Sequence, residues 1–167
     1  YDRGVWSRYT VGGNLFGTAV RKLGFALSAF YQGGKYREGT ALDEYFLSAS
    51  AMYAVGRKLS VGPGVDITSG NNGSDPTKKF QRFDPLYGTP HKFWGFMDYF
   101  YVADGFGPNG LTNYYLKSKY KAKDNLTLSL DAHYFMLPSP VTGQDGLEMD
   151  KALGTEIDFV INYSLTK

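Results

Sequence analysis

One stretch of the sequence decides the fold class, and it reads Leu59-Ser60-Val61-Gly62-Pro63-Gly64-Val65-Asp66-Ile67-Thr68. Every odd position carries an apolar side chain, and every even position carries a small or polar one. A period of two is the pattern of a β-strand with one apolar and one polar face. The same alternation recurs along the chain and predicts seven strands, at residues 8–19, 23–32, 44–55, 59–68, 113–120, 126–135 and 153–164.

The connections between these segments are alternately short and long. The short ones are tight hairpin turns at residues 20–22, 56–58 and 121–125, and the long ones are loops at residues 33–42, 70–110 and 137–151. Strands joined in this way are antiparallel, with the turns at one end of the sheet and the loops at the other. An eighth strand through residues 91–102 would place the 121–125 turn at the wrong end, so we interpret 70–110 as a single loop.

The composition excludes several classes of protein. The 167 residues contain no cysteine, which excludes disulfide scaffolds, thiolate metal sites and cysteine nucleophiles. A net charge of +2 leaves no broad basic footprint, so we expect no nucleic-acid partner. No apolar run approaches the roughly 18 residues of a membrane-spanning helix. A hydrophobic content of 43%, with 17% aromatic residues, argues against disorder.

Tyrosines mark both ends of the apolar face. Those near the long loops are Tyr9, Tyr31, Tyr45, Tyr114 and Tyr134, and those near the tight turns are Tyr53, Tyr120 and Tyr163. A tyrosine ring can lie among acyl chains while its hydroxyl reaches the headgroups, and transmembrane barrels carry aromatic girdles at both interfaces. The sequence therefore predicts two girdles that contact outer-membrane lipid.

Alternation by itself also fits a soluble β-sandwich or lipocalin-like barrel whose apolar face is its core. Strand length favours a membrane barrel, because crossing a bilayer takes about 9 to 11 tilted residues and soluble strands usually have about 5 or 6. The polar face is mostly Gly, Ser, Thr and Asn, as expected of a water-filled lumen. We therefore predict an all-β, antiparallel up-and-down transmembrane β-barrel in the outer membrane of a Gram-negative bacterium.

Seven is an odd number of strands. Single-chain bacterial barrels have an even number, and a sheet edge cannot face lipid unpaired. We therefore expect residues 1–167 to form a single partial barrel domain, with the remaining strands of the same barrel as its neighbours. Residues 70–110 are expected to form a long extracellular loop that packs at the rim or folds into the lumen.

The polar face supplies the candidate pore lining. Its charged and titratable residues are Arg8, Glu44, Asp66, Lys117, Lys119, Asp131, His133, Glu156 and Asp158. The hairpin at 121–125 places Lys117 opposite Asp131 or Ser129, within reach of an ion pair. Such a pair serves either as a selectivity patch on the pore wall or as a cross-strand ladder that stiffens it.

One segment carries a resemblance to a known family. It reads Phe83-Asp84-Pro85-Leu86-Tyr87-Gly88-Thr89, followed by Gly95-Phe96-Met97-Asp98-Tyr99-Phe100. It resembles the alginate-export family of outer-membrane porins, particularly its Bacteroidetes versions, and the match is best over residues 59–137. The resemblance implies a large monomeric barrel with long outer loops that passes an anionic polysaccharide or related carbohydrate by diffusion.

The 70–110 loop and the predicted pore lining both indicate which kind of solute could pass. Arg82, His91, Lys92 and Trp94 lie among many aromatic residues and are the candidates for a loop constriction that contacts an oligosaccharide. The alternative is simple packing of the loop at the rim. A polyanion conduit is expected to be lined mainly by Arg and Lys. The lining predicted here is mixed in charge.

Catalysis is not expected. The histidines are His91 and His133, and His133 shares a strand face with Asp131 and Ser129. Side chains at i and i+2 on a strand point in parallel and do not converge as a catalytic triad requires. We expect no cofactor and no metal centre. A soluble barrel that binds an apolar ligand, and a plugged barrel that anchors or docks a partner, remain the alternatives to a porin.

Overall fold

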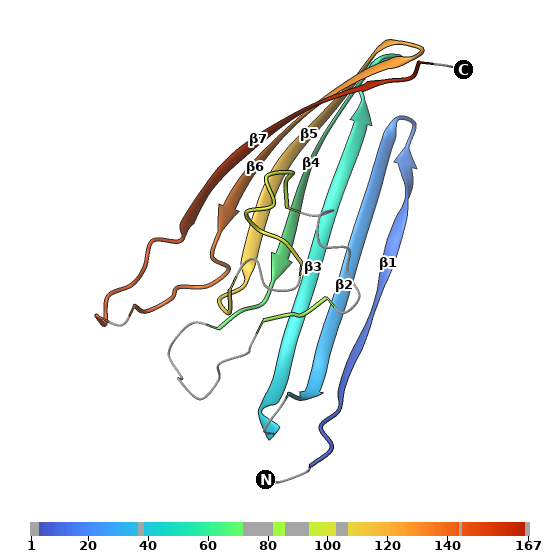
Figure 1. Ribbon diagram of the computed structural model, residues 1–167. Helices are drawn as coiled ribbons and strands as arrows, with labels where there is room; N and C mark the ends of the chain where they lie inside the picture. Colours follow the sequence, from blue (N-terminus) through green and yellow to red (C-terminus); the bar gives the residue numbers. More distant parts are fainter. Residues whose placement is uncertain are drawn as a thin grey trace.

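The computed structural model describes residues 4–36, 39–71, 82–85, 94–102, 107–143 and 145–165. These residues form a single antiparallel sheet whose seven strands are paired in chain order (Figure 1). The strands are β1 (Arg8–Val20), β2 (Leu23–Lys35), β3 (Ala41–Ala54), β4 (Leu59–Thr68), β5 (Leu111–Lys123), β6 (Leu126–Met136) and β7 (Ala152–Tyr163). The prediction of an all-β, up-and-down architecture is confirmed.

Two connections are shorter than the sequence suggested. β2 continues through Gly33 and Gly34 to Lys35, where Lys35 pairs with Ala41 at the start of β3. The two glycines are typical of a loop in the sequence, but in the structure their backbone groups pair with those of β3. A register shift between Lys121 and Lys123 likewise lets β5 extend to Lys123. The hairpin that follows is therefore tighter than the predicted turn.

The tight turns β1–β2, β3–β4 and β5–β6 lie at one end of the sheet, and the N- and C-terminal ends of the chain lie at opposite ends (Figure 1). Within the described residues, β1 pairs only with β2, and β7 pairs only with β6. The sheet is therefore open, with one free edge on each side. Residues 94–102 form bends and a turn rather than a strand, which agrees with reading them as part of a loop.

The described residues contain no helix long and apolar enough to cross a membrane.

Strand pairing depends on a close approach at Gly62. A Cβ atom there would overlap the Ala51 carbonyl oxygen and lie 2.9 Å from the Met52 Cα atom. Both contacts are with the backbone of the neighbouring strand β3, which cannot move without separating the pair. A Cβ atom added at Gly13, on β1, would have no other atom within 4 Å.

We expect Gly62→Ala to lower the free energy of unfolding by about 1 to 3 kcal/mol, because the strands must separate to admit the methyl group. Gly13→Ala is the matched control and should be neutral or slightly stabilising, since alanine loses less backbone entropy on folding. Equilibrium urea unfolding measures both. Equal effects of the two substitutions would show that the close approach at Gly62 does not limit the pairing.

Candidate functional site

The two faces of the sheet differ in what covers them. On one face, apolar side chains from all parts of the sheet are exposed, and they include Val11, Leu15, Leu27, Leu47, Leu116, Leu130, Ile157, Phe159 and Ile161. Ile157 is 73% exposed and Leu15 is 61% exposed. On the other face, the polar side chains nearest the long loops are buried, among them Gln32, Glu44, Asn113, His133, Glu156 and Asp158. Residues 82–85 and 94–102 of the 70–110 loop contact this part of the face. The candidate site is this polar face together with the loop.

The exposed apolar face carries the tyrosines in two rows. All eight that the sequence singled out lie on this face and are between 39% and 59% exposed. Near the long loops, Tyr31 pairs directly with Tyr45, and Tyr114 pairs with Tyr134. The ring centroids of Tyr9 and Tyr31 are 6.3 Å apart. The second row, Tyr53, Tyr120 and Tyr163, lies beside the tight turns.

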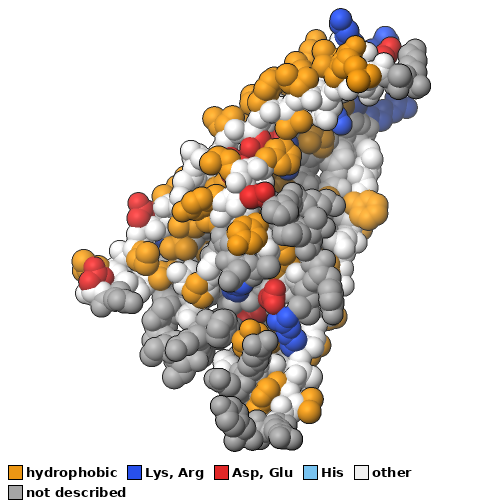
Figure 2. Space-filling model, in the orientation of Figure 1, with side chains coloured by type: hydrophobic (Ala, Val, Ile, Leu, Met, Phe, Trp, Pro, Cys, Tyr) orange, Lys and Arg blue, Asp and Glu red, His pale blue; other side chains and the backbone are white. Residues whose placement is uncertain are grey.

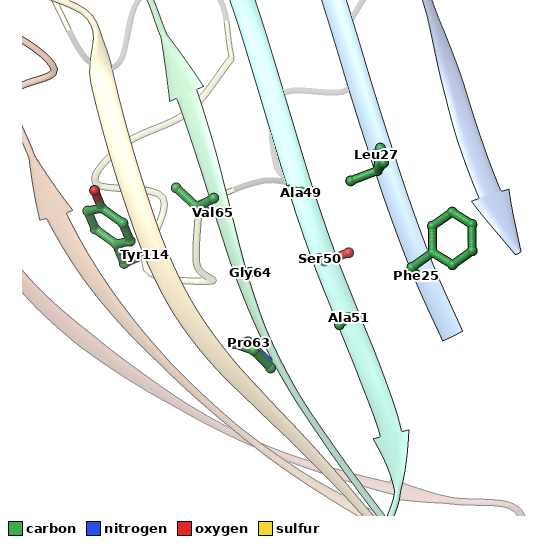
Figure 3. A pocket seen from close by; sticks show the side chains of 9 residues that line it. All are labelled: Phe25, Leu27, Ala49, Ser50, Ala51, Pro63, Gly64, Val65 and Tyr114. Carbon is green, nitrogen blue, oxygen red and sulfur yellow. The ribbon is translucent and has the colours of Figure 1, made fainter. Parts of the chain in front are cut away.

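Between the two rows, small side chains of β3 and β4 leave a shallow apolar groove (Figure 3). Its floor includes Ala49, Ala51 and Pro63, and Leu27 and Tyr114 stand on either side of it. No charged residue lines the groove. It therefore belongs to the apolar face and adds no chemistry to the polar one.

A polar network crosses the opposite face from β3 to β7. The Ser48 hydroxyl donates to the Asp66 carboxylate at 2.6 Å, and the Asn113 Nδ2 atom lies 3.5 Å from the same carboxylate. Asn113 presents its carbonyl oxygen to the His133 Nδ1 atom at 3.0 Å, so Nδ1 carries the hydrogen. The His133 Nε2 atom is 3.8 Å from the Asp158 carboxylate. Asn113 and His133 are 1% and 4% exposed, so the network is closed off from solvent at its centre.

Lys117 lies opposite Asp131, one of the two partners that the hairpin spacing predicts, and the other, Ser129, lies opposite Lys119. The Lys117 ammonium is 3.8 Å from the Asp131 carboxylate and 5.1 Å from the centre of the Tyr115 ring. The Lys117 side chain is still 43% exposed, whereas the Asp131 side chain is only 14% exposed. Lys119, further toward the tight turns, is exposed. The accessible charge in this part of the polar face is therefore mainly positive.

Glu156 and Asp158 on β7 hold the loop by its backbone. Glu156 accepts a hydrogen bond from the Met97 N–H group at 2.8 Å, and Asp158 accepts one from the Phe96 N–H group at 3.2 Å. The two acidic residues are 4% and 8% exposed. The sequence predicted them as pore-lining charges, and the structure places them beneath the loop, where they bind main-chain donors. A buried carboxylate needs such donors because it has lost its water.

The loop backbone adopts an uncommon conformation at this contact. Trp94, Gly95 and Asp98 all have positive φ angles, of 67°, 90° and 54°. A Cβ atom at Gly95 would overlap the Glu156 carboxylate. Glycine at this position therefore permits both the positive φ and the close approach of the backbone to the acid.

Apolar packing fixes the same part of the loop. Trp94, Phe100 and Val102 pack with Leu111 and Phe135 in a cluster whose members are all at most 8% exposed. The rings of Phe100 and Phe135 are 4.7 Å apart between centroids. Trp94, a candidate for contact with solute, is thus 5% exposed and part of this cluster.

A second attachment point lies at the other edge of the sheet. The Arg8 guanidinium binds the Asp84 carboxylate at 2.8 Å. The Gln32 side-chain amide makes two hydrogen bonds with the Asp84 backbone, donating to its carbonyl oxygen at 3.0 Å and accepting from its N–H group at 3.1 Å. The Phe83 ring stacks on Phe46 with 5.7 Å between centroids. The loop is therefore fastened to β1 and β2 as well as to β7.

Two further candidates lie near this attachment. Glu44 is 1% exposed, and its Oε1 atom has no hydrogen-bond partner among the described residues. Arg82 donates from Nη1 to the Gly107 carbonyl oxygen at 3.1 Å, a contact within the loop. His91 and Lys92 lie outside the described residues. Of the predicted lining residues, Arg8 therefore binds the loop, and Asp66, His133 and Asp158 belong to one polar network. Lys117 and Lys119 remain accessible to solvent.

Sequence reasoning missed Gln32, Asn113 and Gly95. Gln32 and Asn113 lie on the polar face by strand parity, but uncharged side chains did not stand out as candidates. The structure shows each at a junction, with Gln32 0% exposed against the loop backbone. Their position on the polar face was the signal in the sequence that could have identified them. Nothing in the local sequence marks Gly95, because its role depends on Glu156.

The described residues contain no group of three or more His, Asp or Glu side chains that could hold a metal ion. Comparison of the chain with protein-family models, with curated proteins and with solved structures finds no match. The functional argument therefore depends on the geometry of the two faces and the loop.

We expect Gly95→Ala to release the loop from β7, because the added methyl group meets the Glu156 carboxylate in a backbone conformation that alanine disfavours. Trp94 would then contact water, and its fluorescence emission should shift to longer wavelength. The measurement is made with Trp6, the other tryptophan, replaced by phenylalanine.

Gly107→Ala is the matched control. Gly107 also has a positive φ, of 65°, but nothing lies within 4 Å of its Cβ position. An alanine there would also adopt a positive φ but would lack the contact, so the Trp94 emission of this variant should stay unchanged. An equal shift in both variants would attribute the effect to backbone strain and argue against the contact with Glu156.

Proposed function

We propose that the chain forms part of the wall of an outer-membrane β-barrel through which hydrophilic solutes pass. One observation carries the proposal: an apolar face is exposed across the whole sheet and is bordered at both ends by rows of tyrosine. Soluble monomers rarely expose apolar patches larger than a few hundred Å². Lipid acyl chains accommodate such a face, and the tyrosine hydroxyls lie where headgroups would be. Strands of 10 to 14 residues are long enough for a tilted crossing.

The open edges agree with a barrel that has further strands. β1 and β7 each present one unpaired row of backbone N–H and C=O groups within the described residues. Each unpaired backbone group of this kind raises the free energy by on the order of several kcal/mol in hydrocarbon. In the proposed barrel, other strands of the same polypeptide or of another chain pair with both edges.

The polar face supports passage of solutes that carry negative charge. Glu44, Glu156 and Asp158 are buried, so they contribute little to the accessible lining. Lys117 and Lys119 remain accessible, and rings of fixed charge set pore selectivity. Together with the resemblance of residues 83–100 to alginate-export porins, these cations favour an anionic carbohydrate as the solute.

The packing of the loop favours a second candidate function, that of a plugged barrel that anchors or docks a partner. The described parts of the loop lie on the polar face and are attached to β1 and β2 at residue Asp84 and to β7 at Met97. A loop so fastened either narrows the lumen or blocks it. The soluble β-barrel has less support. Its core would be the apolar face, but this face is exposed and the described loop residues pack on the opposite, polar face.

The porin proposal predicts stepwise conductance when the full-length protein is inserted into planar lipid bilayers. The lumen of the proposed barrel is lined by polar groups, so ions should pass along it. A protein that needs detergent for solubility and inserts without conductance would support the plugged barrel instead. Solubility without detergent would contradict both membrane proposals, since the exposed apolar face should cause aggregation in water.

Charge reversal of the accessible lysines should change ion selectivity in the same assay. The variant K117E/K119E is expected to shift the reversal potential in a salt gradient toward cation preference. K117Q/K119Q, which removes the charge without reversing it, should shift the potential about half as far. Both variants lose the contact between Lys117 and Asp131. Equal shifts would therefore assign these lysines a structural role in the wall rather than a selectivity role.

A further inference from the structure

The tight turns carry a dense group of cations that the proposed pore does not use. Each of the three hairpins carries two basic residues in or directly beside its turn, and all six side chains are exposed. We call this group the turn rim, and it consists of Arg21, Lys22, Arg57, Lys58, Lys121 and Lys123. Figure 2 shows Lys and Arg side chains gathered at the upper end of the molecule, where the turns lie in Figure 1.

Backbone hydrogen bonds join the turns side by side. The Ala54 N–H group donates to the Lys22 carbonyl oxygen at 2.9 Å, which links the first turn to the second. The Lys121 N–H group donates to the Lys58 carbonyl oxygen at 2.8 Å, which links the second to the third. The Lys58 ammonium also lies 3.4 Å from the Ala122 carbonyl oxygen. The turn rim is therefore one continuous surface across β1 to β6.

Charge is concentrated at this surface. The six cations of the turn rim and one acidic residue, Asp124 of the third turn, make a net charge of +5 there against +2 for the whole chain. Asp124 pairs with Lys121 at 2.9 Å, and the hydrogen bond from Lys121 holds the pKa of its carboxyl below the usual value. The other five cations have no carboxylate within ion-pair distance among the described residues. A surface of this kind attracts anions.

The apolar face continues directly into the turn rim. Tyr120 immediately precedes Lys121, and Tyr53 lies four residues before Arg57. Both tyrosines belong to the row beside the turns and point to the exposed apolar face. Apolar side chains, then phenol hydroxyls, then ammonium and guanidinium groups follow one another over a few residues. The same order occurs across a lipid monolayer, from acyl chain to glycerol region to phosphate.

We propose that the turn rim binds the phosphates of anionic phospholipid headgroups and so holds this end of the barrel at a negatively charged membrane surface. The inference depends on the membrane barrel proposed above. A soluble polyanion would be attracted by the same charges, but it would gain nothing from the adjoining tyrosines and apolar face. Continuity with that face therefore favours a lipid.

The test compares binding of dioleoylphosphatidylglycerol and dioleoylphosphatidylcholine to the full-length protein in detergent micelles, measured by native mass spectrometry. The two lipids share acyl chains and differ in headgroup charge. The unmodified protein should prefer phosphatidylglycerol. R57Q/K58Q should lower its affinity for phosphatidylglycerol roughly fivefold for each cation removed, and leave phosphatidylcholine binding unchanged.

The matched control is K35Q/K151Q, which removes the same charge at the long-loop end of the sheet. It should change the affinity for phosphatidylglycerol less than twofold. An equal loss in both variants would overturn the proposal, because it would show an effect of overall charge. Binding of tripolyphosphate to the rim without any preference for phosphatidylglycerol would also overturn it, in favour of a soluble polyanion.

These results can be separated from the fate of the porin proposal. Lipid preference is read in micelles and needs no conductance, so a plugged barrel would still show it. A conducting barrel without preference for phosphatidylglycerol would refute the turn-rim proposal alone. Solubility of the protein without detergent would instead refute the membrane barrel on which it depends.

Discussion

The opposite orientation of consecutive side chains along a hydrogen-bonded strand is the constraint on which the rest of this structure depends. Six strand pairs keep one set of alternate residues from all seven strands, most of them apolar, on a single face, with only small register shifts at β1–β2, β5–β6 and β6–β7. A slip of one residue in β3 would bring Glu44 to the apolar face and Leu47 to the polar one. The exposed apolar face and the rows of tyrosine both follow from this single rule.

The polar face is organised by a different requirement, that buried polar groups find hydrogen-bond partners. β7 supplies two carboxylate acceptors and the loop supplies two backbone donors at Phe96 and Met97. At the other edge, the Gln32 amide satisfies the backbone of Asp84. Apolar packing of Phe100 against Phe135 excludes water between these contacts. Residues 82–85 and 94–102 of the loop are thereby held against the polar face of the sheet.

The same arrangement divides charge along the molecule. Buried acidic residues lie beneath the loop, the accessible Lys117 lies nearer the turns, and the turn rim lies beyond it. Up-and-down topology is the reason for this order, because it brings every tight turn to one end. Residues far apart in the sequence, such as Lys22 and Lys121, therefore belong to one surface.

The number and order of the strands, and the face that each strand residue occupies, were determined by the sequence alone, since both depend on a period of two. The hairpin spacing allowed Asp131 or Ser129 opposite Lys117, and the register of the sheet selected Asp131. β4 has the bounds that its alternation predicts. Only the tertiary structure decided that Glu156 and Asp158 bind the loop, that Gln32 binds the backbone of Asp84, and that Gly95 lies against the Glu156 carboxylate. These contacts join residues about 50 to 60 positions apart in the chain. Local periodicity encodes which face a residue occupies, but the path by which a loop returns to that face depends on packing across the whole sheet.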